Sequence, residues 1–161
     1  MMRRFQQIIV MGFIATLSGC NKPSDNSPSG PKEDPKAEEQ PMFISEADYV
    51  QNRAKQIAMT PQTLDKLRGH GVTDESELKL KYFFYTNDKK KAKSLVKELA
   101  KLGYEGGHDI AAEAPDQFLI TGWTIPMRMS NESVVGWTGR MCDLGHKSDC
   151  EFDGWGANPN P

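Results

Sequence analysis

The sequence lacks the patterns that most often indicate catalysis. It has no Cys-x-x-Cys pair, which argues against a redox-active dithiol. It has no Gly-x-Ser-x-Gly elbow for a nucleophile and no glycine-rich loop with phosphate-binding spacing. The formal net charge of −2 gives no electrostatic reason to expect DNA or RNA as a partner. We therefore expect no catalytic residues, no cofactor and no nucleic acid.

Apolar residues are also scarce. They make up 37% of the 161 residues, less than in most compact domains, which indicates that part of the chain does not fold. The scarcity is strongest in residues 21–41, where five prolines alternate with polar residues and Ala37 is the only apolar side chain. Such a segment buries too little surface to offset its ordering entropy. We interpret residues 21–41 as a disordered, proline-rich tether.

The first twenty residues contain the one long apolar run. Arg3 and Arg4 precede apolar residues 8–17, a run too short to cross a bilayer as a helix and typical of a signal peptide. The run ends in Leu17-Ser18-Gly19-Cys20, which resembles the lipobox of bacterial lipoproteins. The resemblance implies cleavage before Cys20 and a membrane anchor through lipid on that cysteine.

This N-terminus predicts a location in the bacterial cell envelope. Residue 21 is an asparagine, not the aspartate that retains enterobacterial lipoproteins in the inner membrane. We therefore favour the outer membrane as the site of the lipid anchor. Acyl chains on a single cysteine would hold the protein firmly, since each buried methylene contributes about 0.8 kcal/mol.

Residues 42–73 predict a helical accessory segment. Ser45 with Asp48 indicates a helix that starts there and ends near Met59. Thr60-Pro61 indicates a second helix, which ends at Gly69-His70-Gly71. We therefore expect two short N-terminal helices.

We expect residues 74–157 to form the main domain, followed by a tail at residues 158–161. Alternating Leu78, Leu80, Tyr82 and Phe84 indicate a strand over residues 78–86. Periodicity and caps then indicate a helix at 89–102, strands at 104–110 and 118–125, a helix after residue 130 and a last strand at 150–156. This order predicts an α+β fold of the ferredoxin-like split βαβ type, with both helices on one face of an antiparallel sheet.

Three stretches carry a resemblance to a known family. Tyr82-Phe83-Phe84-Tyr85-Thr86, Leu102-Gly103-Tyr104-Glu105 and Glu151-Phe152-Asp153-Gly154-Trp155-Gly156 resemble the family of the regulator of ribonuclease E activity B. The resemblance spans residues 74–156, and the terminal strand is its most specific part. It implies a non-enzymatic domain that regulates by binding a protein. If the signal peptide were unused, it would imply a cytoplasmic ribonuclease E regulator.

Four aromatic residues are candidates for contact with an unknown protein partner. Phe83 and Tyr85 lie opposite the Tyr82 face of their strand, and Trp123 lies on the other expected central strand. Trp155 lies near the expected sheet edge, between two glycines. We expect the partner at one of these two places.

Cys142 and Cys150 leave three alternatives open. In an exported protein, two nearby thiols favour a disulfide, but both could also stay free. Cys142, His146 and Cys150 recur every four residues and could bind zinc, with Asp143 or Asp149 as a fourth ligand. That spacing lacks the paired knuckles of common zinc sites, so an extracytoplasmic metal-binding protein or enzyme is the weaker alternative.

Overall fold

The structure is a computed structural model, and it describes residues 42–159. The expected signal peptide, Cys20 and the expected tether lie outside the described residues. Within the described range the chain forms α1 (Glu46–Arg68), β1 (Glu77–Leu78), β2 (Leu80–Thr86), α2 (Lys89–Lys101), β3 (Glu105–Ala111), β4 (Ala114–Trp123), β5 (Met127–Arg128), α3 (Asn131–Lys147) and β6 (Glu151–Ala157).

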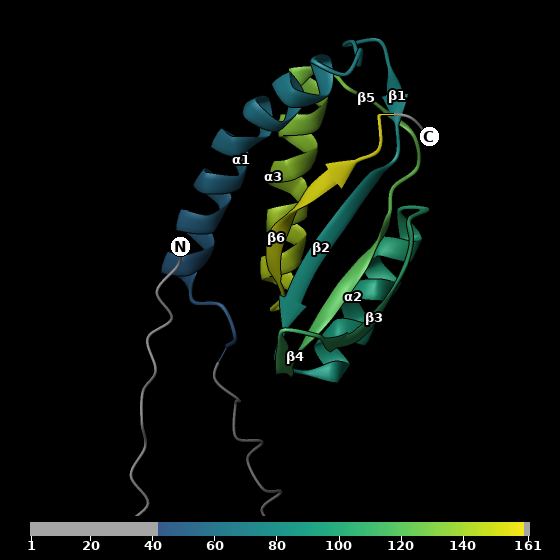
Figure 1. Cartoon of the computed structure of the whole chain (residues 1–161). Coiled ribbons are helices and arrows are strands. Elements are labelled where there is room, and N and C mark those ends of the chain that lie inside the picture. The colour runs from purple at the N-terminus through teal and green to yellow at the C-terminus, as the bar shows by residue number, and fades with distance from the viewer. Residues whose placement is uncertain (1–41, 160–161) are drawn as a thin grey trace, which may run out of the picture. The chain divides into compact units, whose positions relative to one another are not determined.

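Four of these strands form an antiparallel sheet in the order β3-β4-β2-β6 (Figure 1). The short strands β1 and β5 pair with each other in a second, two-stranded sheet. Side chains of α2 and α3 share one core with β2, so both helices cover the same face of the large sheet. The long helix α1 packs along α3 and reaches β6. The expectation of an α+β fold is confirmed.

The predicted alternation of β2 is confirmed. Leu80, Tyr82 and Phe84 are buried, whereas the residues between them are only half-buried. The Phe84 ring lies 5.0 Å from that of Phe152, and Trp137 contacts Phe152 edge-on at 6.0 Å. These rings form the centre of the core, where each buried side chain contributes roughly 1.5–3 kcal/mol of hydrophobic stabilisation.

The expectation of two N-terminal helices is wrong, because α1 is one helix with Pro61 inside it. Proline removes one backbone donor and usually breaks a helix, at a cost of about 3 kcal/mol. Here buried residues lie on both sides of the proline, among them Gln56, Thr60 and Leu64. Burial of this continuous stripe against α3 and β6 offsets the cost of the proline.

Several element boundaries differ from the expected ones. Residues 78–86 do not form one strand, because the strand is interrupted at Lys79 and Leu78 pairs with Met127 of β5. The turn between β3 and β4 lies at residues 112–113, so Pro115 is already inside β4. The helix expected after residue 130 extends to Lys147 and includes Gly145, where the lack of a side chain lets the Cys150 carbonyl oxygen approach closely.

Candidate functional site

One face of the four-stranded sheet carries no helix among the described residues (Figure 1). We call it the open face, and it is formed on the two central strands by Lys81, Phe83, Tyr85, Leu119, Thr121 and Trp123. Phe83 pairs with Thr121, and Tyr85 pairs with Leu119. Side chains on this face are half-buried or exposed, and Trp123 keeps 36% of its surface. Three of the four predicted partner-binding aromatics, Phe83, Tyr85 and Trp123, therefore lie together.

Lys81 shows the kind of contact that the open face makes. Its ammonium nitrogen lies 5.6 Å from the centroid of the Phe83 ring and 5.8 Å from that of the Trp123 ring. At this distance, the negative face of each aromatic ring attracts a cation, by roughly 0.5–1 kcal/mol at an exposed site. The two rings therefore already hold one cation, that of Lys81, beside their apolar surface.

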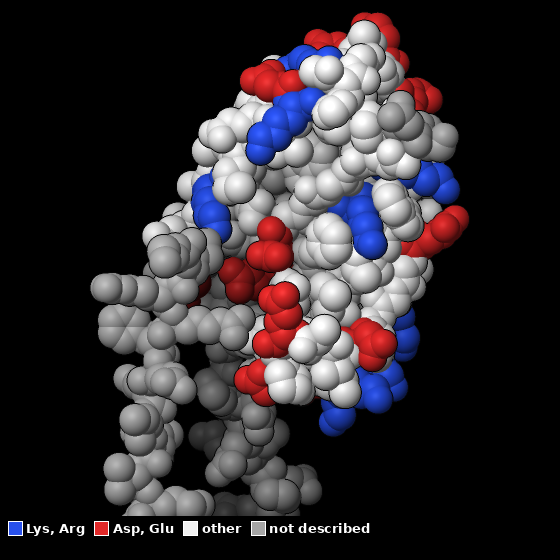
Figure 2. All heavy atoms as spheres, viewed as in Figure 1, with Lys and Arg blue, Asp and Glu red and all other residues white. Residues whose placement is uncertain are grey.

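Carboxylates lie beside the aromatic side chains. Desolvation by the surrounding protein raises the pKa of Glu151 and of Asp153, and the charge of Asp153 raises that of Glu151 further. Desolvation also raises the pKa of Tyr85, with added repulsion from Asp153 and Glu113. Figure 2 shows acidic side chains gathered on this side of the domain, between α1 and β2. A positively charged partner would relieve this repulsion.

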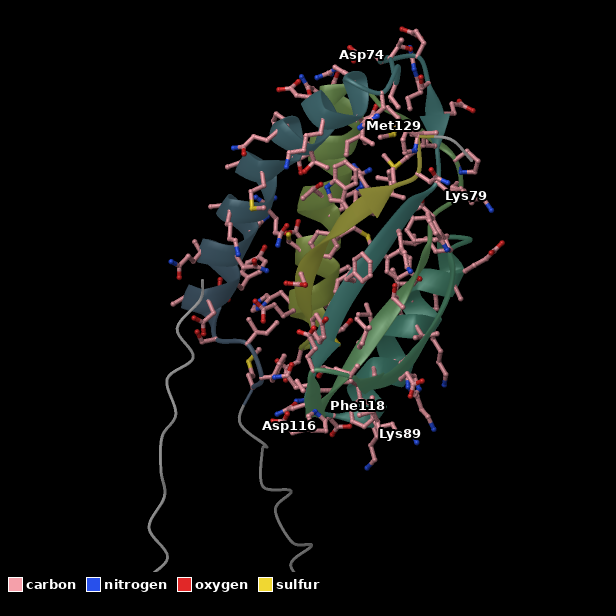
Figure 3. All side chains as sticks on the ribbon, viewed as in Figure 1. Asp74, Lys79, Lys89, Asp116, Phe118 and Met129 are labelled. Atoms are coloured by element: carbon pink, nitrogen blue, oxygen red, sulfur yellow. The ribbon has the colours of Figure 1, made fainter. Side chains whose placement is uncertain are left out.

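Two hollows flank the open face. One has a volume of about 520 Å³ and is lined by Glu77, Leu78, Lys79, Glu105, Trp123, Pro126 and Asn158. The other has a volume of about 560 Å³ and is lined by Phe43, Ile44, Asp48, Gln51, Asn52, Lys55 and Glu151. Figure 3 places Lys79 at the upper end of the sheet, with Asp116 and Phe118 at the lower end of β4. The hollows are shallow grooves lined by mixed side chains, a form that suits a protein segment better than a small substrate.

The fourth predicted contact residue, Trp155, lies on the helix side of the sheet. Its indole nitrogen donates to Thr60 Oγ1 at 3.4 Å, and its ring lies 6.3 Å from that of Trp137. The β2–β6 register shifts between Phe83 and Phe84, so β6 contains a bulge. The extra residue turns Trp155 to the same face as Phe152, which simple alternation would not do. The expected contact edge near Trp155 is therefore occupied by α1.

Cys142 and Cys150 are both buried free thiols in the structure, and no disulfide joins them. Burial raises the pKa of each thiol to about 12. Their surroundings differ, since Arg53 and Asp143 lie near Cys142, whereas Thr86 and Asp149 lie near Cys150. A disulfide therefore remains a prediction for the oxidised protein.

The zinc alternative does not fit the described residues, since no three His, Cys, Asp or Glu side chains among them are placed to hold a metal ion. The ring of His146 stacks on that of Tyr49 at 4.1 Å, and its Nε2 lies 3.0 Å from a Glu46 oxygen. Asp143 accepts hydrogen bonds from Tyr49 and Arg53. The histidine is engaged with α1, not with the two thiols.

Asp149 has a structural role that the sequence did not indicate. Its carboxylate accepts the backbone N–H groups of Phe43 at 2.9 Å and Ile44 at 3.0 Å, and Lys91 donates to it at 2.5 Å. Burial alone would raise the pKa of Asp149, but these three bonds outweigh it and hold the pKa below the usual range. The contact fixes the start of the folded domain to the loop before β6. Partners more than a hundred residues apart leave no signal in a local pattern.

None of the helices in the described part of the chain is long and apolar enough to span a membrane.

Comparison with known proteins places this domain in a family. A comparison with curated proteins found no match. The model of the family "Regulator of ribonuclease activity B" matches residues 57–157, which is more than half of the chain. The match begins inside α1 and ends with the last residue of β6. The chain belongs to the Regulator of ribonuclease activity B family.

Proposed function

We propose that this protein is a non-enzymatic regulator that binds a protein partner through the open face. The observation that carries the proposal is an uncovered central pair of strands with Phe83, Tyr85 and Trp123 on one side. Aromatic side chains of this kind dominate the energetics of protein interfaces. Membership of a regulator family supports the same conclusion.

We further assign the four-stranded part to the ferredoxin-like split βαβ arrangement. The strand order β3-β4-β2-β6 and the placement of α2 and α3 on one face support this assignment. In such a domain the face without helices is available to a partner. The assigned fold therefore leaves the proposed binding surface accessible to a partner.

We also propose that the domain is displayed on the bacterial envelope through lipid on Cys20. The support is the lipobox-like sequence before Cys20 and the charged, apolar segment that precedes it. The intact mass of the endogenous protein from a membrane fraction tests this. Cleavage before Cys20 with added acyl mass is the expected result. An unprocessed chain in the cytosol would reject the anchor and favour the second candidate, a cytoplasmic regulator of a ribonuclease, which the family name supports.

Site-directed cross-linking in the native cell tests partner binding. A photoreactive benzoylphenylalanine in place of Tyr85 lies on the open face, and the same residue in place of Lys97 on α2 is the matched exposed control. We expect one defined adduct from position 85 and none from position 97. Substitution Phe83→Ser should remove the adduct while leaving the unfolding midpoint within a few degrees. Equal labelling from both positions, or no adduct from position 85, would refute the proposal.

A further inference from the structure

The two outer edges of the four-stranded sheet differ. The edge of β6 is covered by α1, where Asn52 Nδ2 donates to the Phe152 carbonyl oxygen at 2.8 Å. The other edge is β3, which pairs only with β4 in the described structure. Apart from Ala111, no residue of β3 is buried. An uncovered edge strand presents a row of backbone donors and acceptors to another chain.

The outward backbone groups of β3 can be assigned. The Ile110 N–H bonds to the carboxylate of its neighbour Asp109 at 2.8 Å, so it takes no part in the ladder with β4. A Cβ on Gly122 would meet the Gly106 Cα at 2.5 Å, a close approach that is typical of a non-hydrogen-bonded pair. Because outward and inward groups alternate in an antiparallel ladder, the backbone groups of Gly106, His108 and Ile110 point away from the sheet.

The side chains of β3 alternate between two environments. Glu105 and Asp109 pair with Trp123 and Leu119, so they lie on the open face. Ile110 lies on the opposite side and is 59% exposed, which is unusual for an isoleucine on a sheet. A strand added beside β3 would therefore meet carboxylates on one of its faces and apolar surface on the other.

The charges of β3 oppose pairing with a second copy of this chain. The strand contains two carboxylates and no lysine or arginine. An antiparallel pair of copies centred on Gly107 would place Glu105 of each opposite Asp109 of the other, and directly opposed like charges destabilise a sheet. No other register of β3 with itself places a lysine or arginine opposite either carboxylate, because the strand contains none. Glu105 lies 3.9 Å from Lys79, but its side chain stays 78% exposed and accessible to a further cation. The edge is therefore complementary to a different, positively charged strand.

We propose that β3 is a docking edge that accepts an extended, basic segment of a protein partner as a fifth strand. Lysine or arginine at alternate positions of that segment would lie beside Glu105 and Asp109, and aliphatic residues between them would cover Ile110. Backbone hydrogen bonds to Gly106 and His108 hold the segment, as in β-strand addition generally. The inference rests on the proposed function, because it specifies the chemistry of the partner that the open face would bind.

The test uses the full chain labelled with ¹⁵N and a capped seven-residue peptide of alternating lysine and valine. We expect amide hydrogen exchange at Gly106 and His108 to slow at least tenfold with the peptide. The amides of Gly107 and Asp109, which face β4, should change little. A peptide of alternating glutamate and valine should leave all four exchange rates unchanged. Exchange that does not slow at Gly106 and His108 with the lysine peptide would overturn the proposal.

A pair of variants separates edge docking from general charge attraction. Asp109→Lys should weaken binding of the lysine peptide at least tenfold. Asp116→Lys makes the same charge change on exposed β4 residue 116, and should weaken it less than twofold. Equal loss in both variants would overturn the docking edge. If the edge test fails while the cross-link from position 85 persists, the proposed function stands. If that cross-link is absent while the edge test succeeds, the proposed open-face function fails and peptide docking at β3 remains.

Discussion

Removal of the Asp149 carboxylate should strongly destabilise the folded domain. Asp149 accepts hydrogen bonds from Phe43, Ile44 and Lys91, and only 16% of its side chain is exposed. Hydrogen bonds to charged groups contribute about 1.5–3 kcal/mol each, but three on one carboxylate are not additive. Asp149 also has a φ of 52°, which costs alanine about 1–2 kcal/mol. We expect Asp149→Ala to lower the free energy of unfolding by about 3–5 kcal/mol.

Two companion variants separate the contributions of the hydrogen bonds, the backbone conformation and the charge of Asp149. Asp149→Gly removes the bonds but tolerates the positive φ, so it should lose about 1–2 kcal/mol less than Asp149→Ala. Asp149→Asn keeps the size and conformational tolerance of the side chain but loses the charge that pairs with Lys91. Urea titration followed by tryptophan fluorescence measures all three. The slope of the transition should stay constant if the unfolded state is unaffected.

The free energy of unfolding that is lost when the Asp149 charge is removed should depend on pH in a defined direction. The folded-state pKa of Asp149 is lowered, so its stabilising contribution is present above the unfolded pKa of about 4 and disappears as the pH falls through the folded value. The deficit of Asp149→Asn should therefore be full at pH 7 and should shrink steadily as the pH falls below about 4. An Asp149→Ala protein within about 1 kcal/mol of the parent at pH 7 would refute the reasoning. A deficit independent of pH would refute the role of the charge.

Three further predictions test other parts of the domain. Gly145→Ala should lower the free energy of unfolding by roughly 1–3 kcal/mol, because the new Cβ would lie 2.5 Å from the Cys150 carbonyl oxygen. The control Gly136→Ala, on the exposed side of α3, should be neutral or stabilising by up to about 1 kcal/mol. Urea titration compares the two variants, and equal effects would contradict the close packing at Gly145. In the reduced, folded protein at pH 8, Cys142 and Cys150 should react with a disulfide reagent about two to three orders of magnitude more slowly than in the unfolded protein. The reason is that their pKa values of about 12 leave little thiolate. A fast reaction of the folded protein would contradict the burial of the two thiols. Glu151→Gln should raise the free energy of unfolding at pH 7 by less than about 1 kcal/mol, because the raised pKa of Glu151 means that its charged form is unfavourable in the folded protein. The gain should vanish near pH 4, where the carboxyl of the parent protein is protonated. A destabilised variant at pH 7 would show that the charge is favourable.

Local patterns in the sequence predicted the elements well. The alternation from Leu80 to Phe84 identified β2. Capping signals also indicated helices from residue 89 and after residue 130, and the structure shows Asp88 and Ser130 as the N-caps of α2 and α3. These signals depend on residues a few positions apart, so they can be read without knowledge of the fold. The same reasoning placed Phe83 and Tyr85 on one side of β2 and away from the core.

Tertiary contacts decided the rest. Pro61 predicted a break that burial of α1 against α3 and β6 overrides. The side on which Trp155 lies depends on a bulge, whose position is set by pairing between β2 and β6 and not by the local sequence.

The sequence alone thus determined the order of β2, α2, β3, β4, α3 and β6, the buried face of β2 and the family resemblance, but not the single helix α1 or the short strands β1 and β5. Only the tertiary structure decided that α1 closes the β6 edge while β3 stays open, and that Asp149 holds the start of the folded domain. The physical reason is range. Periodicity and capping act between neighbours along the chain, whereas edge coverage, register and long-range hydrogen bonds depend on segments that meet only after folding.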